Sequence, residues 1–171
     1  MTTKQLRQQV KSLLDRAEVV EPPVPVDDIA VALGARVRYS DLDEELSGMI
    51  YIREDTPIIG VNSRHHPNRQ RFTIAHEIAH LVLHRDSLIN QVHVDKRFPV
   101  LMRDASSATG TRLMEIEANR FAAELLMPSA FLDEMLRESG FDIDDEAPLN
   151  RWAKKFLVSR QALEFRIRNM M

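Results

Sequence analysis

A five-residue run with two histidines and a glutamate offers the clearest chemistry in this sequence. His76-Glu77-Ile78-Ala79-His80 places two imidazoles four residues apart, with a carboxylic acid directly after the first. Because residues i and i+4 share a helix face, both rings can bind one metal ion. Zinc lowers the pKa of a water that it binds to about 7, and a neighbouring carboxylate can take the proton. The motif predicts zinc-dependent amide hydrolysis, with His76 and His80 as ligands and Glu77 as the general base. Another divalent metal is an alternative.

The motif lies in a segment that is predicted to form a buried helix from about Asn68 to His84. Apolar residues fill the rest of the helical wheel around the motif, which is typical of a helix in a core. Its histidines and Glu77 crowd one arc, and unpaired polar groups in a core cost several kcal/mol. A bound metal explains this clustering. The alternative is a set of core histidines hydrogen-bonded to carbonyl groups, with Glu77 on a water.

A catalytic zinc site usually has three protein ligands, so a third must come from elsewhere. His84 is too far along the helix, because residues at i, i+4 and i+8 span about 12 Å, and it is expected to support the site or to pack. A histidine six residues after the second is excluded, because that position is Asp86. The next predicted helix, Leu113 to Met127, carries acidic residues. Its periodicity leaves three candidates open: Glu115, Glu117 and Glu124.

The composition is that of an ordinary globular protein and limits the kinds of site. The chain has 171 residues, 44% of them hydrophobic and 29% charged, and a net charge of -3. It contains no cysteine, which excludes thiolate ligands and disulfides, so a metal must be held by histidine and carboxylate. No apolar stretch is long enough for a membrane span, and residues 1–20 predict an amphipathic helix and no signal peptide. A cytoplasmic enzyme without membrane contact is expected.

The remaining segments predict an α+β fold, mainly helical, with a small antiparallel sheet before the metal helix. We expect one domain, 1–171, in four parts. Residues 1–20 form the N-terminal helix, and 24–84 form a helix, the small sheet and the metal helix. Residues 85–112 form an irregular loop that could gate the site, and 113–171 form helices, the first of which would carry the third ligand. An edge strand of the sheet could hold an extended peptide by main-chain pairing, or it could only support the core.

Two sequence blocks resemble the ImmA/IrrE family of metallopeptidases. They are RFTIAHEIAHLVLH at 71–84 and EANRFAAELLMP at 117–128, and the similarity extends to PVDDIAVALG at 25–34 and to the C-terminal helices. The resemblance implies a zincin-like fold and a gluzincin-like site in which Glu117 is the third metal ligand, with Glu115 as the fallback. It also implies a regulatory endopeptidase that cleaves a helix-turn-helix type repressor. A toxin-like component of a two-gene system is the alternative within the family.

Three further questions follow from the sequence. The donor that stabilises the oxyanion could be His65, His66, His93 or Tyr51. Residues 149–163 resemble a helix-turn-helix, and 151–171 hold six cations against Glu164, which would suit DNA binding. Direct DNA contact is nevertheless not expected, because the whole chain is slightly acidic. A metal-dependent interaction module without proteolysis is the last alternative, although a structural zinc would need no neighbour such as Glu77.

Overall fold

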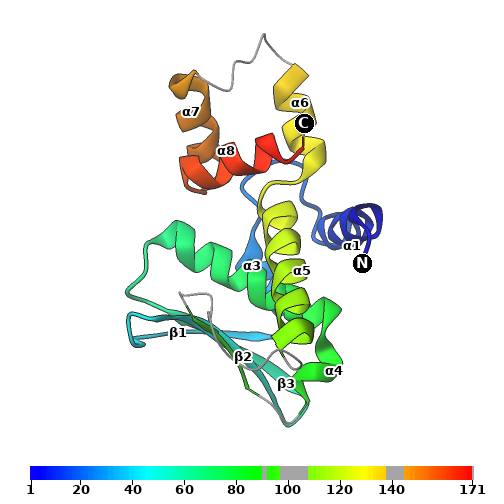
Figure 1. The fold of residues 1–171 in the computed structure, drawn as a ribbon, viewed down its shortest axis with the longest axis vertical. Helices are drawn as coiled ribbons and strands as arrows, with labels where there is room; N and C mark the ends of the chain where they lie inside the picture. Colours follow the sequence, from blue (N-terminus) through cyan, green and yellow to red (C-terminus); the bar gives the residue numbers. More distant parts are fainter. Residues whose placement is uncertain (90–91, 97–107, 138–144, 171) are drawn as a thin grey trace. The chain divides into compact units, whose positions relative to one another are not determined.

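The computed structural model describes residues 1–89, 92–96, 108–137 and 145–170. They form two compact units, Val26–Ala122 and a second unit made of Met1–Pro25 with Ala123–Met171 (Figure 1). The single domain expected from the sequence stays a prediction. Within the described ranges, no helix is both long and apolar enough to cross a membrane.

A four-stranded mixed sheet is the base of the first unit. Its strands are β1 (Arg36–Ser40), β2 (Leu46–Arg53), β3 (Thr56–Asn62) and β4 (His93–Lys96), in the order β1-β3-β2-β4. Strands β2 and β3 form a hairpin, with positive φ at both turn residues, Glu54 and Asp55. The α+β class is confirmed.

The sheet differs from the sequence prediction in two respects. It is not purely antiparallel, because β1 pairs with β3 in parallel. The predicted irregular loop 85–112 contains a short helix, α4 (Arg85–Leu88), and the edge strand β4, which pairs antiparallel with β2. Such a pairing between distant segments leaves no local signal in four residues. Residues 90–91 and 97–107 of this range lie outside the described residues, so a gating loop stays a prediction.

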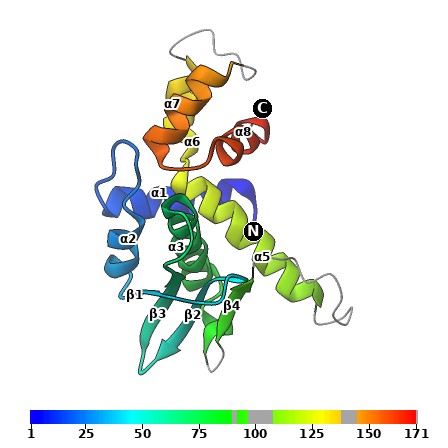
Figure 2. The same ribbon diagram turned by 90° about the vertical axis from the view of Figure 1, so that its left-hand side faces the viewer.

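The predicted metal helix is α3 (Pro67–Leu83), and it packs on β2, β3 and the short helix α2 (Val26–Ala32). Figures 1 and 2 show α3 lying across one face of the sheet. His66 caps its N-terminus by accepting a hydrogen bond from the backbone N–H of Asn68, and Pro67 occupies the first turn, where its missing N–H costs nothing. The helix is anchored by fully buried side chains on both layers: Ile50, Ile59, Val61, Ile74 and Ile78.

The helix α5 (Ala108–Leu126) is longer than predicted, and Gly110, which falls in the range 85–112 that was expected to be an irregular loop, lies inside it. Its residues up to Ala122 belong to the first unit and the remainder belong to the second. Because a single glycine lowers helix stability by only about 1 kcal/mol relative to alanine, the surrounding helix tolerates it.

The second unit is helical. Its helices are α1 (Thr3–Arg16), α6 (Ser129–Arg137), α7 (Glu146–Phe156) and α8 (Arg160–Arg168). Ser159 is the N-cap of α8, and its side chain accepts a hydrogen bond from the backbone N–H of Ala162. Helices α7 and α8 pack against each other, and two of the exposed cations pair with acids, Arg160 with Glu146 and Arg168 with Glu164.

A buried carboxylate stabilises this second unit. The side chain of Glu124 is 6% exposed, and its Oε1 accepts hydrogen bonds of 2.9 Å and 2.8 Å from the backbone N–H and the hydroxyl of Ser129. The guanidinium of Arg166 pairs with its Oε2, and Nε of Arg7 lies 3.6 Å from the same oxygen. Both carboxylate oxygens of Glu124 thus have a donor.

Candidate metal centre

Three elements of the first unit bring their side chains to one point. From α3, His76 and His80 are at most 2% exposed, and their Nε2 atoms are 3.1 Å apart. From α5, the carboxylate oxygens of Glu115 lie 3.3 Å from Nε2 of His76 and 3.4 Å from Nε2 of His80. From β4, Nε2 of His93 lies 3.1 Å from Oε1 of Glu115. One donor atom from each of these four residues lies within 4.8 Å of the others.

These separations fit a zinc ion. Zinc binds nitrogen and oxygen at about 2.0–2.1 Å, which places neighbouring ligands of a tetrahedral site about 3.3 Å apart. Burial lowers the pKa of His80 to about 4, so at neutral pH its ring keeps a lone pair for a metal. Although burial alone would raise the pKa of Glu115, its contacts with His76, His80 and His93 hold it below the usual value. His80 and Glu115 are therefore in the protonation states that metal binding requires. The pKa of His76 is raised in the absence of metal, because burial, which lowers it, is outweighed by the hydrogen bond to Glu115 and by the charges of neighbouring carboxylates.

Glu77 lies beside this cluster and is fully buried. Within the part of the chain that the structure describes, neither of its carboxylate oxygens has a hydrogen-bond partner. Burial raises its pKa to about 8, an effect that the neighbouring His76 only partly opposes. Buried polar groups without partners are rare in native proteins, and this carboxyl fits a group that is kept for a water held at the metal.

The close approach of β2 to this carboxyl depends on a glycine. A Cβ atom at Gly48 would meet Thr73 of α3, would lie 2.7 Å from the carbonyl oxygen of Gly60, and would be 3.6 Å from Oε1 of Glu77. Only a residue without a side chain therefore lets the sheet and α3 come together here.

The structure brings the predicted ligands His76 and His80 together with Glu115, and it does not bring Glu117 to the same point. Oε2 of Glu117 lies instead 3.2 Å from Nε2 of His84. Residues i and i+2 are about 200° apart around a helix, so Glu115 and Glu117 cannot both face one ion. We therefore take Glu115, the fallback of the sequence analysis, as the third candidate ligand in place of Glu117.

Of the four candidate oxyanion donors, the structure brings His93 to the cluster. Its ring packs on that of His80, with centroids 3.9 Å apart. His65 lies near the carbonyl oxygen of Glu44, and His66 caps α3. Because side chains alternate along a strand, Tyr51 lies on the opposite face of β2 from Gly48.

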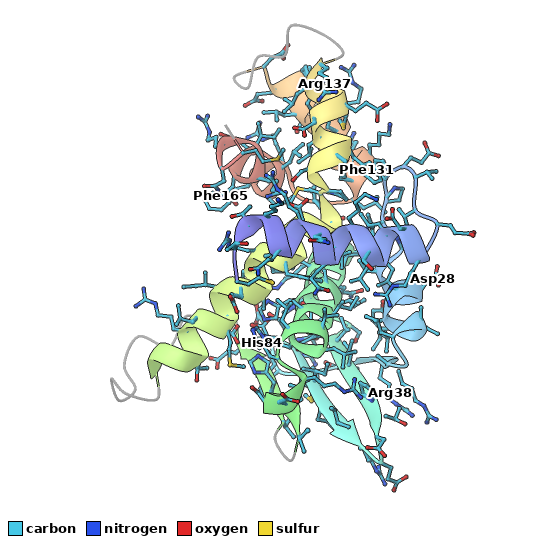
Figure 3. All side chains as sticks on the ribbon, turned by 90° about the vertical axis from the view of Figure 1, so that its right-hand side faces the viewer. Asp28, Arg38, His84, Phe131, Arg137 and Phe165 are labelled. Atoms are coloured by element: carbon cyan, nitrogen blue, oxygen red, sulfur yellow. The ribbon has the colours of Figure 1, made fainter. Side chains whose placement is uncertain are left out.

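Both α3 histidines are also held at their second ring nitrogen. Nδ1 of His76 lies 3.1 Å from Oδ1 of Asn119 on α5. Nδ1 of His80 lies 3.2 Å from Nδ1 of His84, which is labelled in Figure 3. Such outer contacts fix ring orientation at metal sites. This placement agrees with the expectation that His84 supports the site.

The fold and this cluster are typical of one class of protein. These are the metallopeptidases in which two histidine ligands and a neighbouring glutamate, here His76, His80 and Glu77, lie on one helix. The family model of the IrrE N-terminal-like domain, peptidase M78, matches residues 30–168, and the chain belongs to this family. The family resemblance of the two sequence blocks is thereby confirmed.

Individual relatives agree with this assignment. The chain is 37% identical over 84 residues to the radiation response metalloprotease IrrE of Deinococcus deserti, and 37% identical over 87 residues to that of Deinococcus radiodurans. Each match covers 48% of this chain but only 27% and 23% of the relatives, about a quarter of their length. A solved Mycobacterium tuberculosis transcriptional regulator shares the fold, with a TM-score of 0.63 and 19% identity over 94% of this chain and 45% of that one.

Proposed function

We propose that this protein is a zinc-dependent endopeptidase in which His76, His80 and Glu115 hold the metal. The observation that carries the proposal is the carboxyl of Glu77, which is fully buried and unpartnered within the described residues beside four converging donor atoms. A structural metal site would not require such a costly group. Membership of a metallopeptidase family supports the same function.

The chain's own residues supply the proton transfers and the alignment. A bound zinc ion would act as a Lewis acid that acidifies water and polarises the scissile carbonyl. The positive charge of the ion would also lower the pKa of Glu77, so that its carboxylate can accept the proton of the attacking water as the water oxygen bonds to the carbonyl carbon. Glu77 then passes this proton to the nitrogen of the leaving amine, and the C–N bond breaks. We assign His93 to the oxyanion of the tetrahedral intermediate, because a fourth protein ligand would close the position that a catalytic metal keeps open.

An extended polypeptide is the substrate that the sheet favours. In the described part of the chain, β4 is an edge strand, and it carries His93. A peptide that pairs with the free edge of β4 would be held by main-chain hydrogen bonds next to the metal cluster. Such binding accepts internal segments of a protein, as an endopeptidase requires.

We further propose that the substrate is a helix-turn-helix type repressor in the cytoplasm. The supporting observation is the family, whose relatives in two Deinococcus species are named radiation response metalloproteases. Cleavage of a repressor would convert a proteolytic event into a change in transcription. The test is to incubate the purified protein and zinc with the repressor encoded beside its gene and to weigh the products. An intact repressor would exclude this substrate.

The catalytic assignment is tested separately by Glu77→Gln. Removing a general base should lower cleavage of a protein substrate by about 10²–10⁴-fold, and the zinc content should stay at the wild-type level because Glu77 is not a ligand. Glu164→Gln, on the surface of α8, is the matched control. Undiminished cleavage by the Glu77 variant would end the proposal.

A further inference from the structure

A second histidine–glutamate pair lies directly behind the metal cluster. His84 follows the last turn of α3, where its backbone N–H donates to the carbonyl oxygen of His80, and its side chain is 8% exposed. Its Nδ1 lies 3.2 Å from Nδ1 of His80, and its Nε2 lies 3.2 Å from Oε2 of Glu117. The ring of His84 therefore connects a candidate metal ligand to a carboxylate.

With a neutral His84 ring, the hydrogen-bonding capacities of these groups permit one direction of donation. A carboxylate only accepts, so Nε2 of His84 must carry the proton that it donates to Glu117. The neutral ring of His84 then has a lone pair at Nδ1 and can accept from Nδ1–H of His80. With its proton at Nδ1, His80 has its lone pair at Nε2, the atom that lies 3.1 Å from Nε2 of His76 in the cluster.

We propose that Glu117 and His84 are positioning residues that fix the tautomer and orientation of His80 for metal binding. The inference rests on the metal site of the proposed function. It gives His80 the support that His76 receives directly from Asn119. It also assigns a role to Glu117, which the helix geometry removes from the ligand set.

Zinc affinity is the first test, because it requires no substrate. Competition between the full-length protein and a chromophoric chelator should show binding about 10–100-fold weaker in Glu117→Ala and His84→Ala, as is usual when an outer partner of a ligand is lost. Glu117→Gln should recover most of the affinity, because its amide oxygen can accept from Nε2–H of His84. His84→Gln should recover most of it as well, because its amide oxygen can accept from Nδ1–H of His80. His65→Ala, away from the cluster, is the matched control. Circular dichroism of the metal-free variants checks that they fold.

The tautomer itself is the second readout, and a merely structural role would not move it. Long-range ¹H–¹⁵N spectra of the metal-free protein at one fixed pH should show His80 protonated at Nδ1. In Glu117→Ala the His80 signal should shift toward a mixture of tautomers, and Glu117→Gln should restore it.

The outcomes separate this inference from the proposed function. Wild-type zinc affinity and an unchanged His80 tautomer in both alanine variants would overturn the positioning role and leave the metal site intact. A wild-type protein that binds no zinc would instead overturn the metal site, and the ¹H–¹⁵N spectra would still decide whether Glu117 and His84 set the tautomer.

Discussion

Two buried carboxyl groups of this protein have opposite surroundings. Glu124, in the second unit, is surrounded by donors from Ser129, Arg166 and Arg7. Glu77, in the first unit, is more deeply buried, yet neither oxygen has a partner within the described residues. The first arrangement is typical of a carboxylate that stabilises a fold, because its desolvation is offset by ion pairs and hydrogen bonds. The second makes the fold less stable, and it therefore indicates that the group serves another purpose.

The largest expected effect comes from removing the carboxylate that completes the cluster. Glu115→Ala should weaken zinc binding by more than the roughly 100-fold expected for an outer partner, because a direct ligand is lost. Chelator competition measures the effect, and Glu117→Ala serves as the comparison on the same helix. Equal losses in the two variants would contradict the assignment of Glu115 as the ligand.

The counterpart in the second unit is Glu124→Ala. It leaves Arg166, whose side chain is 13% exposed, without its carboxylate, and breaking such a pair from one side typically costs about 3–5 kcal/mol. Urea unfolding of the zinc-free protein measures this loss. Zinc affinity of the folded variant should stay within twofold of the wild type. A stability loss below 1 kcal/mol would mean that the ion pair does not hold this unit together.

A smaller effect, of opposite sign, is expected for Glu77→Gln in the metal-free protein. The pKa of Glu77 is raised from 4.5 to about 8 in the folded state, so the native protein binds the extra proton between these values. Its stability contribution is complete below about pH 4.5 and is lost as the pH rises through about 8. Glu77→Gln removes the ionisable group, so the variant does not lose this stability as the pH rises. Its unfolding free energy should exceed that of the wild type by up to a few kcal/mol at pH 8.5, and the difference should shrink at lower pH.

Urea unfolding of both chelator-treated proteins at several pH values gives the comparison. Glu164→Gln, at a partly exposed position, should show no such trend. A constant difference between Glu77→Gln and the wild type at every pH would contradict the raised pKa.

The smallest effect concerns the contact that shields Glu77. Gly48→Ala places a methyl group against Thr73 and the carbonyl oxygen of Gly60, and overpacking of this kind typically costs about 1–3 kcal/mol. Thermal unfolding measures the loss. Gly110→Ala is the control and should be neutral or stabilising by up to about 1 kcal/mol, because nothing lies within 4 Å of a Cβ atom there and alanine favours the helix. A neutral Gly48 variant would show that β2 can move away from α3.

The sequence predicted the elements whose signals are local. The motif and the apolar wheel were enough for α3, and Ser159, a residue type that favours helix N-caps, marks the start of α8. The strand β4 could not be predicted, because its four residues are ordered by pairing with β2, far away in the sequence. For the same reason the sequence named His93 as a candidate oxyanion donor but could not choose it over the three other candidates.

The choice between Glu115 and Glu117 was also beyond the sequence. Their side chains are 32% and 26% exposed, so neither belongs clearly to the apolar face of α5. Which of them faces the histidines depends on the rotation of α5 about its axis. That rotation is set by packing against α3, and the helix's own periodicity does not contain it.

The spacing of Glu115, Glu117 and Asn119 has a thermodynamic consequence. The three residues lie within about 6 Å along one helix axis and reach His76, His80 and His84 from a single rigid element. Ion binding and the docking of this segment of α5 on α3 are therefore linked equilibria, in which each must strengthen the other. Slower amide hydrogen exchange in α5 on addition of zinc would report metal occupancy without any substrate.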